Sequence, residues 1–168
     1  MPGRSTRSLG GVEKVPSLNA AKLSRITQPM AETYLRGGKI VIHAVCVTDG
    51  GGGACLPCVT LDVGCPDEDL GLALNSVLAA SAVVPLPGDF DREFRQVLKV
   101  AGASSWRKLS EGAVCCSVSA QNGGISVIPS KREKGGFSYL PGATVQVSDS
   151  SEARVIGAAL REGWQRST

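Results

Sequence analysis

"LPCVTLDVGCPDEDLGLALNSVLAAS", residues 56–81, is the stretch of this sequence that decides the fold. Its first part alternates apolar and polar residues from Val59 to Val63, as a half-buried strand does. Pro66 and three acidic residues follow, and they suit the first turn of a helix, where free N–H groups and the helix dipole favour negative charge. Apolar residues then recur at helical spacing: Leu70, Leu74, Val77 and Leu78. The stretch therefore predicts a strand followed directly by a helix over residues 67–81.

A second stretch repeats this arrangement. "TVQVSDSSEARVIGAAL", residues 144–160, also runs from a strand through an acidic segment, which resembles a capping box, into a helix. Within the two helices, "LGLAL" at 70–74 matches "IGAAL" at 156–160. Gly and Ala on one helical face allow a helix to approach a sheet closely. We expect two similarly placed strand–helix units on one sheet.

The other segments complete an α+β prediction. We expect a strand at 39–47, a loop in "DGGGG" at 49–53, a helix at 90–102 after the N-cap Asp89, and a short helical turn at 104–112. Residues 113–130 predict a hairpin around Asn122-Gly123, and residues 131–142 a polar, Gly-rich loop. A strand at 143–147 and a helix at 150–165 follow. The prediction is a mixed or mostly antiparallel sheet of about five strands, with helices packed mainly on one face.

Domain organisation and composition indicate one globular unit. Residues 37–168 are expected to form a single α+β domain, and residues 1–36 an N-terminal arm and an irregular or helical segment that Pro29 interrupts. Of the 168 residues, 42% are hydrophobic and 20% charged, which is typical of globular proteins. No run of about 18 apolar residues predicts a membrane helix, and the basic N-terminus lacks the apolar core of a secretory signal. We therefore expect the cytoplasm, with all six cysteines as reduced thiols.

The net charge of +3 conceals a strong segregation. Residues 1–40 carry seven Lys and Arg against two acidic residues, and residues 94–168 carry ten against five, so each segment has a net charge of +5. Residues 41–93 carry eight acidic residues against Arg92 alone, a net charge of −7. Such a stretch argues against nucleic acid as its ligand and favours a basic protein partner. The alternative is that the acids are ordinary solvated loop and helix-start residues.

The cysteine-rich segment "ACLPCVTLDVGC", residues 54–65, has three possible roles: a metal site, a redox centre, or small apolar residues in the core. Zinc needs four ligands, and only Cys55 and Cys58 form a close pair, while the neighbours Cys115 and Cys116 would point to opposite faces of a strand. A redox centre would place its CxxC at a helix start, but a β-branched strand follows here. We therefore expect the cysteines to serve as small hydrophobes in an aromatic-poor core.

No enzyme signature is present. His43, the only histidine, lies between Ile42 and Ala44 in an apolar strand and is expected to be a satisfied core residue. The run "DGGGGACLPC" lacks the Gly-Lys-Ser/Thr ending of a phosphate loop. The carboxylates at 62–69 lack the spacing of a calcium loop. We expect no metal, no cofactor and no catalytic residue, although an enzyme that uses a cysteine thiolate remains an alternative.

The order of motifs in the C-terminal two thirds resembles that of the immunity proteins of bacterial contact-dependent growth inhibition (CDI) systems. The resemblance covers residues 59–164 and rests on "LGLAL", then "SSWRKL" leading into "CCSVSAQNGGISVIPS", then "KGGFSYLPG", "ATVQV" and "SEARVIGAAL". It implies a non-catalytic, cytoplasmic protein that binds the C-terminal toxin domain of a cognate effector, often a nuclease, in a 1:1 complex and blocks it. The alternative is a structural or oligomeric protein-interaction module without a toxin.

The partner-binding residues are predicted from charge, because the resemblance supplies no site. A nuclease active site is basic, so an acidic surface would attract it and speed association. The predicted contacts are Asp62, Asp67, Glu68, Asp69, Asp89, Asp91 and Glu93. Asp67 to Asp69 have an alternative role as helix caps, and the "DGGGG" and "KREKGG" loops are alternative contact regions.

Overall fold

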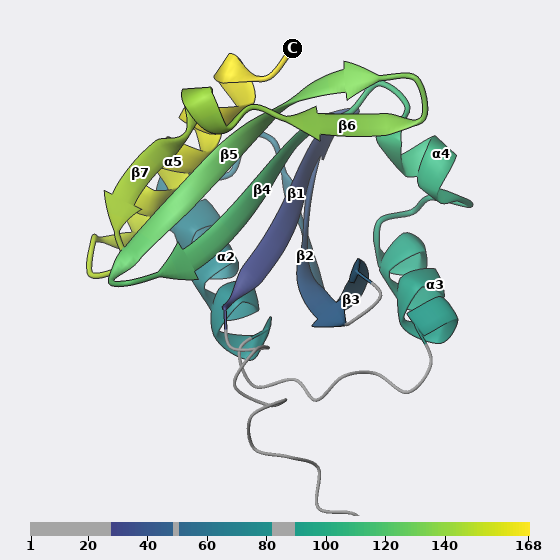
Figure 1. Cartoon of the computed structure of the whole chain (residues 1–168), viewed down its shortest axis with the longest axis horizontal. Helices are drawn as coiled ribbons and strands as arrows, with labels where there is room; N and C mark the ends of the chain where they lie inside the picture. Colours follow the sequence, from purple (N-terminus) through teal and green to yellow (C-terminus); the bar gives the residue numbers. More distant parts are fainter. Residues whose placement is uncertain (1–27, 49–50, 82–89) are drawn as a thin grey trace, which may run out of the picture.

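The computed structural model describes residues 28–48, 51–81 and 90–168, which form one antiparallel sheet flanked by helices (Figure 1). The elements are β1 (Met30–Arg36), β2 (Lys39–Thr48), β3 (Gly51–Asp62), α2 (Asp67–Ser81), α3 (Phe90–Val100), α4 (Trp106–Ser110), β4 (Val114–Gln121), β5 (Gly124–Glu133), β6 (Gly136–Tyr139), the 3-10 turn η2 (Pro141–Ala143), β7 (Val145–Ser148) and α5 (Ala153–Arg166). The α+β class is confirmed, and the described sheet has seven strands where about five were expected.

The sheet order is β3-β2-β1-β4-β5-β6, with β7 paired to β5. Its central strand comes from a segment that we expected to be irregular or helical, since residues 30–36 form β1. Met, Ala, Glu, Leu and Arg are good helix formers, but β1 pairs with β2 on one side and β4 on the other, and this pairing overrides local propensity. The expectation for residues 1–27 lies outside the described residues.

Two tight turns join the central strands. Asn122 and Gly123 both have positive φ, 53° and 76°, and they close the hairpin of β4 and β5, which confirms the prediction for residues 113–130. Gly37 and Gly38, with φ of 55° and 77°, close the hairpin of β1 and β2 in the same way. Positive φ at both central positions is the geometry that suits the right-handed twist of the flanking strands.

The helices α2 and α5 lie together against one face of the sheet (Figure 1). A Cβ atom on Gly71 would lie 1.8 Å from the carbonyl oxygen of Ala153, and one on Gly157 would lie 1.9 Å from that of Asp67. The matched glycines of the two strand–helix units therefore meet each other's helix rather than the sheet. The capping box expected before α5 does not form, because its N-cap Glu152 makes no side-chain capping hydrogen bond.

The helices α3 and α4 pack on the opposite face. Alternate residues of β1 and β2 point to opposite faces of the sheet and belong to two different hydrophobic clusters. Ile40 and Ile42 lie in the cluster with α2 and α5. Tyr34 and Val41 lie in the cluster that contains Leu98 of α3 and Leu109 of α4. The expectation of one main helical face holds for α2 and α5 but not for α3. The apolar stripe of a helix shows that one side is buried and carries no information about which face of a sheet buries it.

Two segments expected to be loops are strands. Residues 131–142 contain the end of β5 and β6, which pair across a turn with Gly135 at φ 100°. Gly51 to Gly53 form the start of β3 and pair with β2, while residues 49–50 lie outside the described residues. Strand pairing uses backbone groups, so a neighbouring strand can hold a segment of weak β propensity.

Candidate functional site

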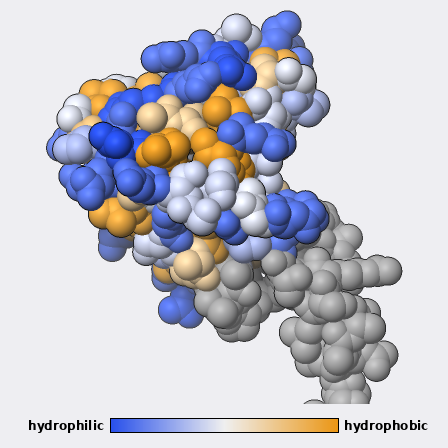
Figure 2. All heavy atoms as spheres, turned by 90° about the vertical axis from the view of Figure 1, so that its left-hand side faces the viewer, coloured by the Kyte–Doolittle hydropathy of each residue, from blue (hydrophilic) through white to orange (hydrophobic). Residues whose placement is uncertain are grey.

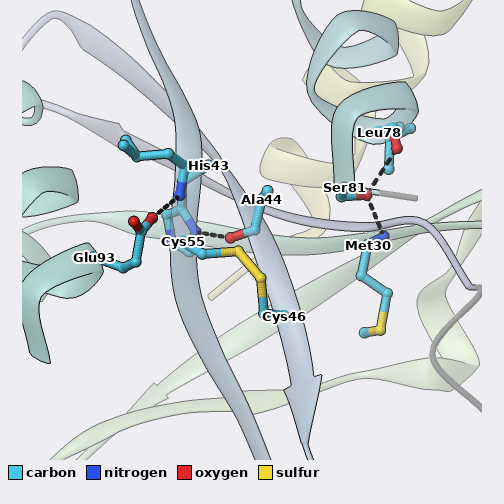
Figure 3. Close-up of a disulfide and its surroundings, with 9 residues drawn as sticks. Met30, His43, Ala44, Cys46, Cys55, Leu78, Ser81 and Glu93 are labelled. Carbon is cyan, nitrogen blue, oxygen red and sulfur yellow. Dashed lines mark hydrogen bonds between the residues drawn. A yellow bond between two sulfur atoms is a disulfide. The ribbon is translucent and has the colours of Figure 1, made fainter. Parts of the chain in front are cut away.

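The cysteine-rich segment contains a disulfide. Cys46 of β2 and Cys55 of β3 are bonded across the two strands, with their Cα atoms 6.1 Å apart (Figure 3). The expectation of six reduced thiols was therefore wrong for this pair. A register shift between His43 and Ala44 places Cys55 opposite Ala44, so Cys46 is its diagonal neighbour. Sequence spacing contains no information on this pairing, because it depends on the register of two strands.

Three of the free thiols, half-buried Cys58 and buried Cys115 and Cys116, are not poised for nucleophilic chemistry. Burial raises the pKa of Cys58 and of Cys116 to about 12, and it also raises the pKa of Cys115. The thiolate is the nucleophilic form of cysteine, so these groups are protonated at neutral pH. Cys115 and Cys116 belong to the clusters on opposite faces of the sheet, as predicted for neighbours in a strand.

His43 is buried, but only one of its ring nitrogens is satisfied. Nδ1 donates to the carbonyl oxygen of Ala44 at 2.8 Å, whereas Nε2 has no hydrogen-bond partner and lies 3.7 Å from a carboxylate oxygen of Glu32. Burial lowers the pKa of His43 despite this carboxylate, so the ring is neutral. It stacks on Tyr34 with 5.7 Å between the ring centroids. The prediction that His43 is a core residue is confirmed, whereas the prediction that its hydrogen bonding is satisfied is wrong for the Nε2 atom.

Glu32 is the centre of a polar cluster on the α3 and α4 face. Its Oε2 atom accepts a hydrogen bond from the Tyr34 hydroxyl at 2.5 Å, and its Oε1 atom accepts one from the Tyr139 hydroxyl at 2.6 Å. Burial and the neighbouring Glu32 raise the pKa of both tyrosines, which keeps them protonated as donors. Two fixed donors on one carboxylate orient it and hold it in place.

A cavity of about 540 Å³ opens beside this carboxylate, between the sheet and the helices α3 and α4. It is lined by Met30, Glu32, Val45, Gly53, Ala54, Phe94, Trp106, Ser117 and Tyr139. Trp106 lies edge-on to Tyr34 at 5.4 Å and tilted against Phe94 at 5.8 Å. Five of the seven aromatic residues of the chain gather at or beside this cavity: Tyr34, Phe94, Trp106, Phe137 and Tyr139.

The wall formed by α3 is fixed to β3 at the register shift. The Leu56 N–H group donates to a carboxylate oxygen of Glu93 at 3.1 Å, and Figure 3 shows Glu93 directed from α3 towards this strand. An N–H group at a strand irregularity has no partner in the neighbouring strand, and leaving it unpaired costs free energy. The hydrogen bond to the carboxylate removes this cost. Glu93, predicted as a partner contact, therefore has a structural contact within the chain.

The four predicted contacts near α2 fall into two groups. Asp62 is exposed at the end of β3 and pairs with Lys39, and Asp67 pairs with Arg161 of α5 at 2.5 Å. Arg161 also donates to the carbonyl oxygens of Val63 and Cys65, so Asp67 is part of a connection between α5 and the turn before α2. The other two, Glu68 and Asp69, are exposed in the first turn of α2.

The remaining predicted contacts lie elsewhere. Asp91 is exposed in the first turn of α3, and Asp89 lies outside the described residues. Because α2 and α3 pack on opposite faces of the sheet, the acidic residues that are close in the sequence do not form one surface. Charge counting also missed Glu32 and its aromatic neighbours. The sequence feature that points to them is the scarcity of aromatic residues: in a chain with 4% aromatic residues, a cluster of them marks an unusual site.

Within residues 28–48, 51–81 and 90–168, no three His, Cys, Asp or Glu side chains are grouped to hold a metal ion. No helix in these ranges is long and apolar enough to cross a membrane.

Solved structures with the same fold include the following two. One is a protein of unknown function, NMB0488, from Neisseria meningitidis, with a TM-score of 0.68 and 19% identity over 84% of this chain and 96% of that chain. The other is a chain of the CdiA-CT/CdiI toxin and immunity complex from Yersinia pseudotuberculosis, with a TM-score of 0.63 and 16% identity over 85% of this chain and 99% of that one. No curated protein matches the sequence.

The family comparison covers most of the elements described above. The profile of the family described as "CDI immunity protein" matches residues 55–167, which extend from the disulfide-bonded Cys55 through the last turn of α5. This range agrees with the resemblance over residues 59–164 that the order of sequence motifs indicated. The match spans more than half of the chain, and the chain therefore belongs to the CDI immunity protein family.

Proposed function

We propose that this protein binds the C-terminal toxin domain of a CDI effector in the cytoplasm, in a 1:1 complex, and neutralises it as a non-catalytic inhibitor. The toxin is proposed to be a nuclease. Membership of the CDI immunity protein family, over residues 55–167, is the observation that carries the proposal. The fold shared with a chain of a toxin and immunity complex supports it.

The chemistry of the described residues is compatible with an inhibitor. The free thiols of Cys58, Cys115 and Cys116 have raised pKa values and are protonated at neutral pH, which supports binding rather than catalysis by these cysteines. A nuclease binds phosphates with basic residues, so acidic groups on the inhibitor would complement it and accelerate encounter.

The seven predicted acidic residues remain our proposal for the toxin contacts, and the structure divides them into testable groups. Glu68 and Asp69 on α2, and Asp91 on α3, are exposed and form no ion pair with a described residue. Asp62, Asp67 and Glu93 have partners within the chain, which a toxin contact would have to share or replace. Asp89 lies outside the described residues.

The direct test uses the toxin domain encoded immediately upstream of the gene. Calorimetric titration of the full chain is expected to show 1:1 binding with nanomolar affinity, and the complex is expected to lack the nuclease activity of the free toxin. Binding of a toxin without nuclease activity would overturn only the nuclease assignment. Absence of binding, together with self-association of the chain, would favour the alternative of an oligomeric interaction module.

The two acidic groups are tested separately by charge reversal. Asp91→Lys and the double variant Glu68→Lys/Asp69→Lys are compared with Asp149→Lys, which reverses an exposed acid between β7 and α5. A rim contact changes the association rate and its salt dependence more than the dissociation rate. If Asp91→Lys and the double variant both associate as the wild type does, these three exposed acids are not toxin contacts and the proposed function stands.

A further inference from the structure

The cavity beside Glu32 contains a negative charge that has no lysine or arginine partner among the described residues. The Glu32 side chain is 22% exposed, and among the described residues no Lys or Arg lies within ion-pair distance of it. The nearest basic group is the neutral ring of His43 at 3.7 Å. Both tyrosines that bond to the carboxylate are neutral donors. Among the described residues that line the cavity, Glu32 is therefore the one with a formal charge.

This carboxylate keeps the capacity to accept further hydrogen bonds. An ionised carboxylate has about four lone-pair sites, and the two tyrosines occupy one on each oxygen. A planar guanidinium group is the ligand that matches the remaining sites of both oxygens. The fixed position of the carboxylate reduces the ordering cost that such a contact would otherwise carry.

The walls of the cavity suit the rest of a cationic side chain. Phe94, Trp106 and Tyr139 line the cavity, and the face of an aromatic ring attracts a cation electrostatically. Val45 and Ala54 on the sheet supply apolar surface for a methylene stem. A cavity lined by one carboxylate and several aromatic residues binds a positively charged organic group better than it binds an anion or an uncharged apolar group.

The other side of the molecule has a different character. Figure 2 shows the side that carries β7 and α5 in Figure 1, and hydrophobic residues appear there in small groups between hydrophilic ones. The cavity beside Glu32 combines burial, one charge and clustered aromatic rings, which are the features of an anchor site in a protein interface.

We propose that the Glu32 cavity is the anchor site for one arginine side chain of the toxin domain, held by the Glu32 carboxylate between Phe94, Trp106 and Tyr139. This inference rests on the proposed function and identifies a contact outside the acidic stretch of the sequence. The positive charge of the occupant complements the single negative charge of the cavity, and the occupant brings the partner against the α3 and α4 face.

The test compares two substitutions with the same change in charge. Glu32→Gln removes the charge in the cavity, and Glu133→Gln removes one from the exposed end of β5. Removing one partner of a desolvated charge pair is expected to weaken toxin binding at least about 30-fold in Kd. The control variant is expected to remain within about threefold. Equal affinity of the two variants would overturn the anchor site while leaving toxin binding, and so the proposed function, in place.

A double-mutant cycle then identifies the occupant. Each arginine of the toxin domain is changed to alanine, and one of them is expected to lose its effect when combined with Glu32→Gln, since coupling is confined to groups in contact. If every arginine acts independently of Glu32, the site does not bind an arginine. Circular dichroism and thermal unfolding of Glu32→Gln establish that the variant is folded. Tyr139→Phe, which removes one orienting donor at the exposed rim, provides a second variant with an expected smaller loss.

A measurement without the toxin separates failure of the cavity from failure of the proposed function. The full chain is titrated with N-acetyl-arginine amide, and Trp106 reports occupancy through its fluorescence or its indole NMR signal. Saturable binding at millimolar concentration is expected for the wild type, with loss in Glu32→Gln and no binding of N-acetyl-norleucine amide. Absence of any arginine-dependent signal, with toxin binding unaffected by Glu32→Gln, would overturn the inference.

Discussion

The two faces of the sheet use their charged residues in opposite ways. On the α2 and α5 face, two backbones approach through Gly71 and Gly157, and the Asp67 carboxylate is paired with Arg161. On the α3 and α4 face, aromatic rings surround a cavity, and the Glu32 carboxylate is bonded to tyrosines without an arginine or lysine partner among the described residues.

This difference separates stability from recognition. A paired carboxylate beside a close helix crossing contributes to holding the fold, whereas a desolvated carboxylate without a cation costs free energy until a partner supplies one. Substitutions of the two glycines at the helix crossing are therefore expected to change unfolding more than toxin binding. Substitutions at Glu32 are expected to change binding more than stability.

The largest effect is expected from adding a side chain at the close contact between α2 and α5. Gly157→Ala adds a good helix former, worth about 1 kcal/mol in an open helix, but the new Cβ atom would lie 1.9 Å from the backbone oxygen of Asp67. Because a backbone atom cannot rotate away, the cost of this clash exceeds the gain in helix propensity. We expect the free energy of unfolding to fall by about 3 kcal/mol in urea titrations. Gly142→Ala, where a Cβ atom meets nothing within 4 Å, is the control. Equal stability of the two variants would mean that the helices do not cross this closely.

The disulfide provides the next largest effect. Cys46 and Cys55 are nine residues apart, and a loop of this size contributes about 2 to 3 kcal/mol through the unfolded chain. Reducing agent is expected to lower the free energy of unfolding of the wild type, measured by urea titration, by that amount. The double variant Cys46→Ala/Cys55→Ala is expected to be insensitive to reducing agent. A wild type that does not respond to complete reduction would contradict the stabilising role of the bond.

Arg161 tests the paired charge on the same face. Arg161→Ala removes the ion pair with Asp67 and two hydrogen bonds to carbonyl oxygens, all partly exposed to solvent. Solvent screening limits the loss of unfolding free energy to about 1 kcal/mol. Arg154→Ala, whose side chain is more exposed and pairs with Glu152, is the matched control and should change little. A fall in toxin affinity at unchanged stability would mean that the Arg161 side chain supports toxin binding rather than the fold.

The smallest effect appears only in acid and comes from His43. Burial lowers its pKa below the ordinary value of 6.5, so between these two values the unfolded chain binds more protons than the folded one. The contribution of His43 to the free energy of unfolding is therefore fully present above pH 6.5. It falls as the pH decreases towards the lowered pKa, with a slope of at most about 1.4 kcal/mol per pH unit. Glu32 and Tyr34 are the titratable groups facing the ring. In His43→Phe this component of the slope should disappear, and an unchanged slope would assign it to other groups.

Local patterns predicted much of this architecture. The period of apolar residues in α2 gave its bounds, Asn122-Gly123 marked the hairpin, and the repeated "LGLAL" and "IGAAL" segments indicated two equivalent strand–helix units. Each of these features depends on residues within a few positions of one another. β1 was missed because its residues favour helices and become a strand only between β2 and β4. The acidic residues were grouped by sequence, whereas the sheet separates α2 from α3.

By itself, the sequence determined the α+β class, the family resemblance and the local elements, because periodicity, turn residues and motif order are properties of adjacent positions. Only the tertiary structure decided that Cys46 bonds to Cys55, that α3 lies across the sheet from α2, and that Glu32 meets Tyr139 from more than a hundred residues away. These contacts depend on strand register and on the choice of a sheet face. Both are settled by the packing of the whole core, which no single segment encodes.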